Sequence, residues 1–311
     1  MRDIVITLLI FGSLPWILWR PWIGILVWSW VGYMNPHRLT WGFAYDMPFA
    51  LLIGGTLLAS ILIAMMFGRE KFRFPWSGTI ILWLLFIIWM YLTTVLAIYP
   101  DRAMLSLDKV FKIQLMSLIT LILITNANRI QALIWVIVGS IGYYSVKGGV
   151  FTIVTGGAFR VLGPGGSDIA DNNSLAVAIL MIVPLMYYLY RIYHHNHWVR
   201  WLLGASILLS IVSAFGSQSR GALVAILAVG GFFWLKSSTK MVTGSVLVLL
   251  GVLTFSFMPE SWHERMATIT NYQEDASAMG RIHAWEYSIN IASDRLIGGG
   301  FNSWSPETYA I

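Results

Sequence analysis

Four basic residues lie in settings where a cation could hold a phosphate or diphosphate group. Arginine presents a rigid fork of N–H donors to phosphate oxygens, and lysine adds a point charge. A helix that begins in the run GSQSRGA, at 216–222, would add backbone N–H groups to such a site. The residues predicted to bind the group are Lys147 in YYSVKGGVF, Arg160 in GGAFRVLGPGG, Arg220 with its neighbours Gln218 and Ser219, and Arg281 in MGRIHAWEYS.

Each of the four cations also has a simpler structural explanation. The amine of Lys147 could extend from an apolar helix to the membrane interface. Arg160 could be an ordinary loop residue, Arg220 could stabilise the end of a helix, and Arg281 could lie on a solvated helix face. The residues alone leave both readings open.

Several other kinds of chemistry are excluded or weakly supported. The chain has no cysteine, which excludes disulfides, thiolate catalysis and cysteine-ligated metals. The loop 163–173 lacks the spacing of a nucleotide-binding P-loop. Its glycines predict tight turns, and Asp171, Asn172 and Asn173 predict a cap for the next helix. We find no spacing typical of a metal site, so neither a metal nor another cofactor is expected.

Six histidines offer acid–base groups in principle. His194, His195 and His197 cluster in a short loop, where a solvated surface explains them better than a metal does. His263 and His283 lie in the polar tail of the chain and could serve as a base, although neither has a distinctive setting.

The composition shows which solvent surrounds these residues. Hydrophobic residues make up 58% of the 311-residue chain, charged residues only 11%, and the mean hydropathy is +0.72. An ordinary soluble domain is about one quarter charged. The chain is therefore expected to be an all-α, polytopic membrane protein. Its net charge of +6 fits basic cytoplasmic loops, and without a basic run or a soluble domain no nucleic acid is expected as a partner.

Long apolar segments predict about nine or ten transmembrane helices. The first 34 residues contain two short apolar runs divided by Arg20 and Pro21, which predict either a tight hairpin or one broken helix. The clearer spans are expected at about 47–67, 77–98, 108–125, 130–154, 173–191, 200–216, 219–235 and 240–258.

The distribution of Lys and Arg among the loops predicts their sidedness. The loops near Arg69, Arg129, Arg191 and Lys236 are expected in the cytoplasm, while loops 35–46, 99–107 and 155–172 and the tail face outward. The expected organisation is an N-terminal transmembrane region, 1–199, followed by a region at 200–311. The second region has helices to about 258 and an outward loop at 259–311, with helical spacing in 279–292. Further spans are expected beyond this loop, so the sequence reads as truncated at its C-terminus.

Two segments near the C-terminus resemble the O-antigen ligase and polymerase superfamily of bacterial inner-membrane glycosyltransferases. They are GSQSRGALVAI at 216–226 and GRIHAWEYSINIASDRLIGGGFNSW at 280–304. NPHRLTWGFAYDMPFA at 35–50 and VKGGVFTIVTGGAFRVLGPGGSDIADNNSLA at 146–176 resemble a subgroup of O-glycosylation ligases associated with exosortase systems. The resemblance covers nearly the whole chain.

The resemblance implies transfer of a glycan from an undecaprenyl-diphosphate carrier to a lipid or protein acceptor. The reaction would occur on the periplasmic face of the inner membrane, without metal or nucleotide. Arg220 and Arg281 match the family's essential arginines, so their implied catalytic role is to bind the diphosphate and stabilise its developing charge. The family's essential histidine lies in a His-Asn motif further along the loop, and no such motif precedes Ile311.

Three alternatives stay open at this point. A polysaccharide polymerase of the same superfamily would differ only in its acceptor. A secondary transporter is less well supported, because we see no internal repeat and no intramembrane carboxylate pair. A non-catalytic membrane scaffold would predict that Arg220 and Arg281 can be replaced without loss of activity.

Overall fold

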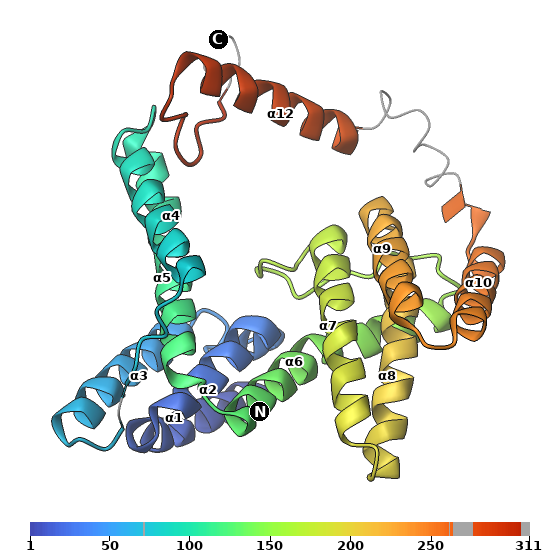
Figure 1. Ribbon diagram of the computed structural model, residues 1–311, viewed down its shortest axis with the longest axis horizontal. Helices are drawn as coiled ribbons and strands as arrows, with labels where there is room; N and C mark the ends of the chain where they lie inside the picture. Colours follow the sequence, from blue (N-terminus) through green and yellow to red (C-terminus); the bar gives the residue numbers. More distant parts are fainter. Residues whose placement is uncertain (71, 261, 264–275, 306–311) are drawn as a thin grey trace. The chain divides into compact units, whose positions relative to one another are not determined.

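The computed structural model describes residues 1–70, 72–260, 262–263 and 276–305, and within them the regular structure is entirely helical (Figure 1). The all-α class predicted from the sequence is confirmed. The helices are α1 (Arg2–Trp19), α2 (Pro21–Met34), the short 3-10 helix η1 (Pro36–Leu39), α3 (Phe49–Met66), α4 (Gly78–Val95), α5 (Pro100–Leu123), α6 (Ala127–Val154), α7 (Asn172–Ile192), α8 (His197–Gly216), α9 (Arg220–Lys236), α10 (Lys240–Phe257) and α12 (Ala276–Asp294).

Seven of these helices are long and apolar enough to cross a membrane: α1, α3, α4, α6, α7, α8 and α10. The protein is therefore a multi-pass membrane protein. Helices α2 and α9 are shorter, with 14 and 17 residues. Helix α5 has 24 residues, and its first 13 include Asp101, Arg102, Asp108, Lys109 and Lys112. It begins two turns before the apolar span predicted there, because Pro100 and Asp101 suit the first turn of a helix.

The first two helices form an antiparallel hairpin, which answers the question left open by the sequence. Arg20 is extended between them, and Pro21 occupies the first position of α2. A carboxylate oxygen of Asp3, at the start of α1, accepts hydrogen bonds from the backbone N–H groups of Gly42 and Ala44, each at 3.1 Å. The start of α1 therefore lies beside the loop that follows α2.

The chain divides into two compact units. The first comprises Met1–Leu57 and Ala127–Ile269, and the second comprises Leu58–Asn126 and Thr270–Ile311. The core of the first unit is formed by α6, α7 and α8. Helix α7 contributes fully buried side chains at alternating spacings of four and three residues, which place them on one face. They are Leu175, Ile179, Ile182, Met186 and Leu189.

Glycines allow α6 and α8 of this unit to approach closely. A Cβ atom added at Gly148 would lie 2.3 Å from Ser213 Oγ, and one added at Gly149 would lie 2.3 Å from the Leu209 carbonyl oxygen. At Gly216 an added Cβ would lie 1.9 Å from Thr152 Oγ1. Small residues at helix contacts are typical of membrane bundles, where close backbone packing replaces the hydrophobic drive.

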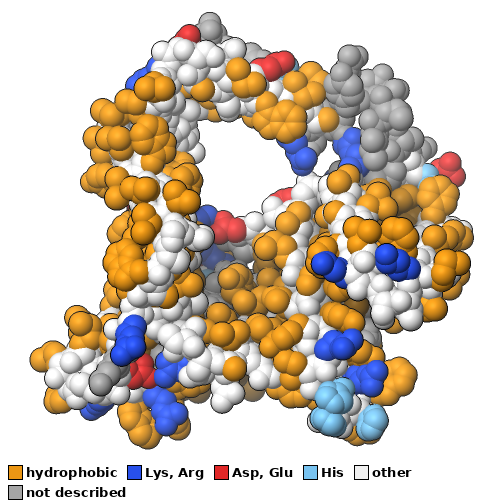
Figure 2. Space-filling view, in the orientation of Figure 1, with side chains coloured by type: hydrophobic (Ala, Val, Ile, Leu, Met, Phe, Trp, Pro, Cys, Tyr) orange, Lys and Arg blue, Asp and Glu red, His pale blue; other side chains and the backbone are white. Residues whose placement is uncertain are grey.

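The loops of the first unit lie at two opposite ends of its helices. At one end, Tyr193 Oη accepts hydrogen bonds from Gln131 and Trp135, and the Arg129 guanidinium lies 5.5 Å from the Trp22 ring. Histidine and basic side chains gather at the α7–α8 turn at this end (Figure 2). At the other end, the loop 155–171 contacts the α8–α9 turn and Met258. Which of these two ends faces the cytoplasm stays a prediction.

In the second unit, the segment after α12 folds back onto the turn between α4 and α5 (Figure 1). The Ile98 N–H donates to the Gly299 carbonyl at 3.1 Å, and Arg295 Nη2 donates to the Leu96 carbonyl at 3.0 Å. Gly300 has φ +77°, and a Cβ added there would lie 2.4 Å from the Ala97 Cβ. Only glycine satisfies both conditions at this contact.

Candidate functional site

The site is built around the sharp turn from α8 to α9. Gln218 adopts φ +53°, which is uncommon for a residue with a side chain. Ser219 then caps α9, because its Oγ accepts the N–H of Ala222 at 3.2 Å. Arg220 is the first residue of α9 and is half-buried. The run Gly-Ser-Gln-Ser-Arg thus ends α8 and begins α9, with three residues between the two helices.

Hydrogen bonds tie this turn to the loop 155–171 and to the start of α7. Gln218 Nε2 donates to the Gly157 carbonyl at 3.0 Å, and Ser219 Oγ donates to Asn173 Oδ1 at 2.7 Å. Asn172 Nδ2 donates to the Ser217 carbonyl at 2.8 Å. Ser217, Gln218 and Ser219 are all buried. The turn that carries Arg220 is therefore held by three separate side-chain hydrogen bonds.

The structure revises the expected roles of the three polar residues before α7. Asp171 alone caps the helix, through hydrogen bonds from the N–H groups of Asn173 and Ser174. Hydrogen bonds from Ser174 and from these backbone groups lower the pKa of Asp171 below its ordinary value. Asn172 and Asn173 instead reach 45 and 46 residues along the chain to the α8–α9 turn. Sequence reasoning assigned them to capping because it could not see that long-range contact.

The predicted cations of the first unit do not all lie at one site. Arg160 is exposed on the loop that Gln218 contacts, so Gln218, Ser219, Arg220 and the loop of Arg160 form one assembly. Lys147 is exposed on α6 and lines a separate groove of about 370 Å³, on a different flank of α8. Its two following glycines are buried against α8, so they offer no exposed backbone to a ligand.

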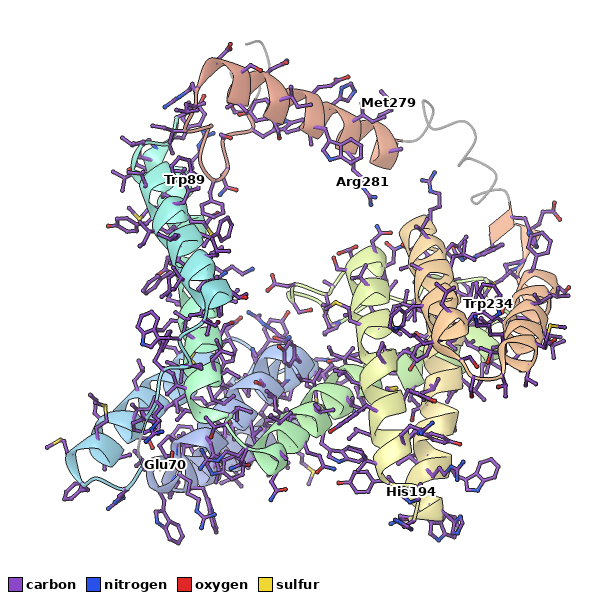
Figure 3. All side chains as sticks on the ribbon, in the orientation of Figure 1. Glu70, Trp89, His194, Trp234, Met279 and Arg281 are labelled. Carbon is purple, nitrogen blue, oxygen red and sulfur yellow. The ribbon has the colours of Figure 1, made fainter. Side chains whose placement is uncertain are left out.

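Arg281 belongs to the second unit, where it lies exposed in the first turns of α12 (Figure 3). Of the two candidate bases, His283 pairs with Glu286 on the same helix at 3.4 Å. His263 packs against the rings of Phe255 and Trp262. Among the described residues, no group of three or more His, Asp or Glu side chains could hold a metal ion.

Arg38 is a further cation at this end of the first unit, and the prediction missed it. It pairs with Asp46 at 3.2 Å, lies 4.6 Å from the Tyr45 ring, and would lie 3.8 Å from a Cβ added at Gly166. The loop after α2 therefore lies beside the glycine-rich loop 163–171. A signal was present, since Arg38 belongs to the outward loop in NPHRLTWG.

An apolar pocket of about 620 Å³ lies between α7, α8, α9 and α10. Leu223, one helical turn from Arg220, is part of its wall, as is Phe215 near the end of α8. Trp234 donates from Nε1 to the Lys240 carbonyl and so joins α9 to α10 at the other end of this hairpin (Figure 3). The other lining residues include Leu180, Val183, Ile207, Ile211, Leu227, Leu247, Leu250 and Phe255. Such a pocket suits a long apolar chain whose charged end lies near Arg220.

Comparison with known families identifies the two parts of the chain. Residues 1–194 match a family of unknown function (DUF5935), to which the chain therefore belongs, and residues 204–311 match the O-Antigen ligase family. The protein is a member of the O-antigen ligase superfamily. No curated protein and no solved structure matches the chain.

The resemblance to O-antigen ligases predicted from the sequence is thereby confirmed, while the exosortase-associated subgroup stays a prediction. The O-antigen ligase match begins at Gly204, inside α8, and includes both Arg220 and Arg281. The partners of the Arg220 turn, Gly157, Asn172 and Asn173, lie in the other matched segment. The two matched segments thus build the candidate site together.

Proposed function

We propose that this protein transfers a glycan from an undecaprenyl-diphosphate carrier to an acceptor at the periplasmic face of the bacterial inner membrane. Membership of the O-antigen ligase superfamily supports glycan transfer of the ligase or polymerase type. The observation that supports the donor most directly is the position of Arg220. It lies on a rigidly held turn, one helical turn from the wall of an apolar pocket.

A polyprenyl diphosphate needs two environments a short distance apart. Its hydrocarbon chain requires apolar walls, which the pocket between α7 and α10 offers. Its diphosphate requires fixed donors at the membrane surface, which the forked guanidinium of Arg220 offers. Pockets of about 300–1,000 Å³ are typical of small-molecule sites, so this one has room for part of such a chain.

In the proposed reaction the anomeric C–O bond to the diphosphate breaks, and an acceptor oxygen bonds to the anomeric carbon. Arg220 and Arg281 would stabilise the charge that collects on the departing diphosphate. The acceptor's proton passes to a base, for which His263 and His283 are the candidates considered from the sequence. The leaving group is already activated, so the proposed step uses neither metal nor nucleotide.

The remaining predicted residues receive supporting roles in this proposal. Gln218 and Ser219 position Arg220, because their side chains bond to Gly157 and Asn173. Arg160 lies on the same assembly and is proposed as a further contact to the diphosphate or glycan. Lys147 is proposed to extend its amine to lipid head groups, since it lines a groove on another flank of α8.

The decisive experiment is transfer in reconstituted vesicles that contain the full-length protein and an undecaprenyl-diphosphate-linked glycan. Arg220→Ala is expected to lower the rate by about 100-fold or more, the effect of removing one essential donor to a developing charge. Leu227→Ala, at the pocket wall, is expected to weaken donor binding more than turnover. Products that lengthen by repeat units would favour the polymerase, and solute uptake without transfer would favour the transporter. Wild-type turnover by Arg220→Ala would overturn the role assigned to Arg220, whereas no transfer and no uptake by the unaltered protein would favour the scaffold.

A further inference from the structure

Helix α12 has a face by which it is attached to the second unit. Tyr287 and Ile291, one turn apart, are buried. The Tyr287 hydroxyl donates to the Ser303 carbonyl at 2.7 Å, and its ring lies 5.2 Å from the Trp304 ring. Ile291 packs beside Gly299, where an added Cβ would lie 3.5 Å from its side chain. This face docks the helix onto the segment that follows it.

A second apolar face of α12 is left uncovered within its unit. Trp285 and Ile289 are four residues apart and each is 65% exposed. Ala292 continues the same helical face, and Leu296, just beyond the helix, is 94% exposed. These are the residues whose helical spacing predicted the helix, yet they do not form its packed face. Arg281 lies at the edge of this face, one turn before Trp285.

The remaining face of α12 is polar. Glu286, Asn290, Ser293 and Asp294 are exposed there, away from both apolar faces. The helix therefore has a docked side, a polar side and an uncovered apolar side with a cation at its margin. An uncovered apolar side with a cation at its margin is a feature of helices that lie in the plane of a membrane surface.

The attachment of α12 determines the depth at which this apolar face lies. Arg295, directly after the helix, bonds to the carbonyl of Leu96, which caps the end of α4. Helix α4 is one of the seven candidate spans, and apolar side chains cover its outer surface (Figure 2). Leu85, Ile88, Trp89 and Leu92 are among the exposed residues of that surface. The start of the docked segment is thus held where a membrane-spanning helix leaves the bilayer.

We propose that α12 lies in the interfacial plane of the lipid bilayer, with Trp285, Ile289 and Leu296 among the outer acyl chains. Arg295 attaches the helix to the end of α4, a candidate span whose exposed apolar side chains already require lipid, which is why lipid is the occupant. Arg281 and Arg295 then lie at the depth of the lipid phosphates, where their charge is complementary to the anionic groups. Trp285 has the amphipathic side chain that is enriched at this depth.

The proposal also gives Arg281 a reason for its position in the proposed transfer reaction. If the apolar face of α12 is inserted in the bilayer interface, Arg281 lies at the same depth as the diphosphate of a membrane-bound donor. That consequence depends on the proposed function, whereas the lipid contact itself does not. The two can therefore be tested and can fail separately.

The 311-residue sequence contains no cysteine, so an introduced thiol is unique within it and allows a direct test. Trp285→Cys and Ile289→Cys, with Asn290→Cys as the matched control on the polar face, would each carry a fluorophore. The full-length protein would be reconstituted in vesicles of phosphatidylethanolamine and phosphatidylglycerol. Quenching by bromine on the lipid acyl chains would be compared with quenching by iodide present on both sides.

We expect lipid-borne bromine to quench the probes at 285 and 289 severalfold more than the probe at 290, and iodide to show the opposite order. Iodide quenching at 285 and 289 equal to that at 290 would overturn the proposal, because the face would then lie in water. Protection of both positions from both quenchers would also overturn it, because protein would then cover the face. A lipid-embedded face in a protein that transfers no glycan would leave this inference intact and reject the proposed function.

Discussion

Arg220 and Arg281 both lie in the segment that matches the O-Antigen ligase family, and both are proposed to bind the diphosphate, yet the two regions that carry them are built differently. Arg220 is half-buried and begins a helix whose preceding turn is held by hydrogen bonds from Gln218, Ser219 and Asn172. Arg281 is exposed on a helix that is attached through a different face, at Tyr287 and Ile291.

The difference shows two ways to fix a cation at a membrane surface. In the first region, buried polar groups hold the turn that carries Arg220, since each unsatisfied group would carry a cost in the bilayer. In the second region, we infer that contact of α12 with the bilayer determines the depth at which Arg281 lies. Arg220 should therefore be sensitive to geometry, and Arg281 mainly to charge.

The largest expected effect is a difference in transfer rate between the two arginines when each is replaced by lysine. Arg220→Lys should lower transfer by about 100-fold, because a lysine cannot replace a guanidinium in fixed bidentate geometry. Arg281→Lys should retain more activity, with a loss of about tenfold, since a flexible ammonium can still reach phosphates from a surface helix. Initial rates in reconstituted vesicles would measure both. Equal losses would contradict the distinction drawn between the two regions.

The next effect concerns the glycines of each region. Gly216→Ala should destabilise the first unit by about 1–3 kcal/mol, because the new Cβ would lie 1.9 Å from Thr152 Oγ1. Gly300→Ala should release the segment after α12, because φ is +77° and Ala97 fills the space. Thermal unfolding in detergent would show the first change, and hydrogen exchange over 295–305 would show the second. Gly165→Ala, with open space around it, is the matched control and should leave both unchanged.

A smaller effect is expected from two asparagines that hold these regions. Asn173→Ala removes the acceptor of the half-buried Ser219 hydrogen bond and should cost about 1–3 kcal/mol. Asn302→Ala removes bonds to Arg102 and Ser106 at an exposed site and should cost about 0.5–1.5 kcal/mol. Denaturation midpoints of both variants would test this order. A larger loss of stability in Asn302→Ala than in Asn173→Ala would contradict this order.

The smallest effect is a pH dependence from His37 in the outward loop of the first unit. Burial, with a contribution from Arg38, lowers the pKa of His37 below its ordinary 6.5. The unfolded chain then binds the proton more tightly than the folded one, so stability falls as pH drops from 6.5 toward the lowered pKa. His37→Gln should flatten the decline in melting temperature between about pH 7.5 and about pH 5.5. An unchanged slope would mean that His37 does not contribute.

Much of the helical framework could be predicted because lipid imposes a simple rule on the sequence: a helix that spans the bilayer needs about 20 mostly apolar residues. Each of the eight clear apolar segments corresponds to a helix, from α3 to α10, and the helix at 279–292 is present as α12. The rule failed in detail where polar residues had long-range partners. Asn172 and Asn173 looked like local caps, yet their side chains bond to the turn between α8 and α9.

The sequence by itself determined that this is a helical membrane protein, where its apolar segments lie, and that its C-terminal part resembles an O-antigen ligase. Those properties depend on local composition and spacing, which a chain carries without folding. Only the tertiary structure decided that residues 1–34 form a hairpin, that Gly148 and Gly149 pack α6 on α8, and that Tyr287 rather than Trp285 lies in the docked face of α12. These outcomes depend on contacts between residues far apart in the chain, whose partners no local pattern specifies.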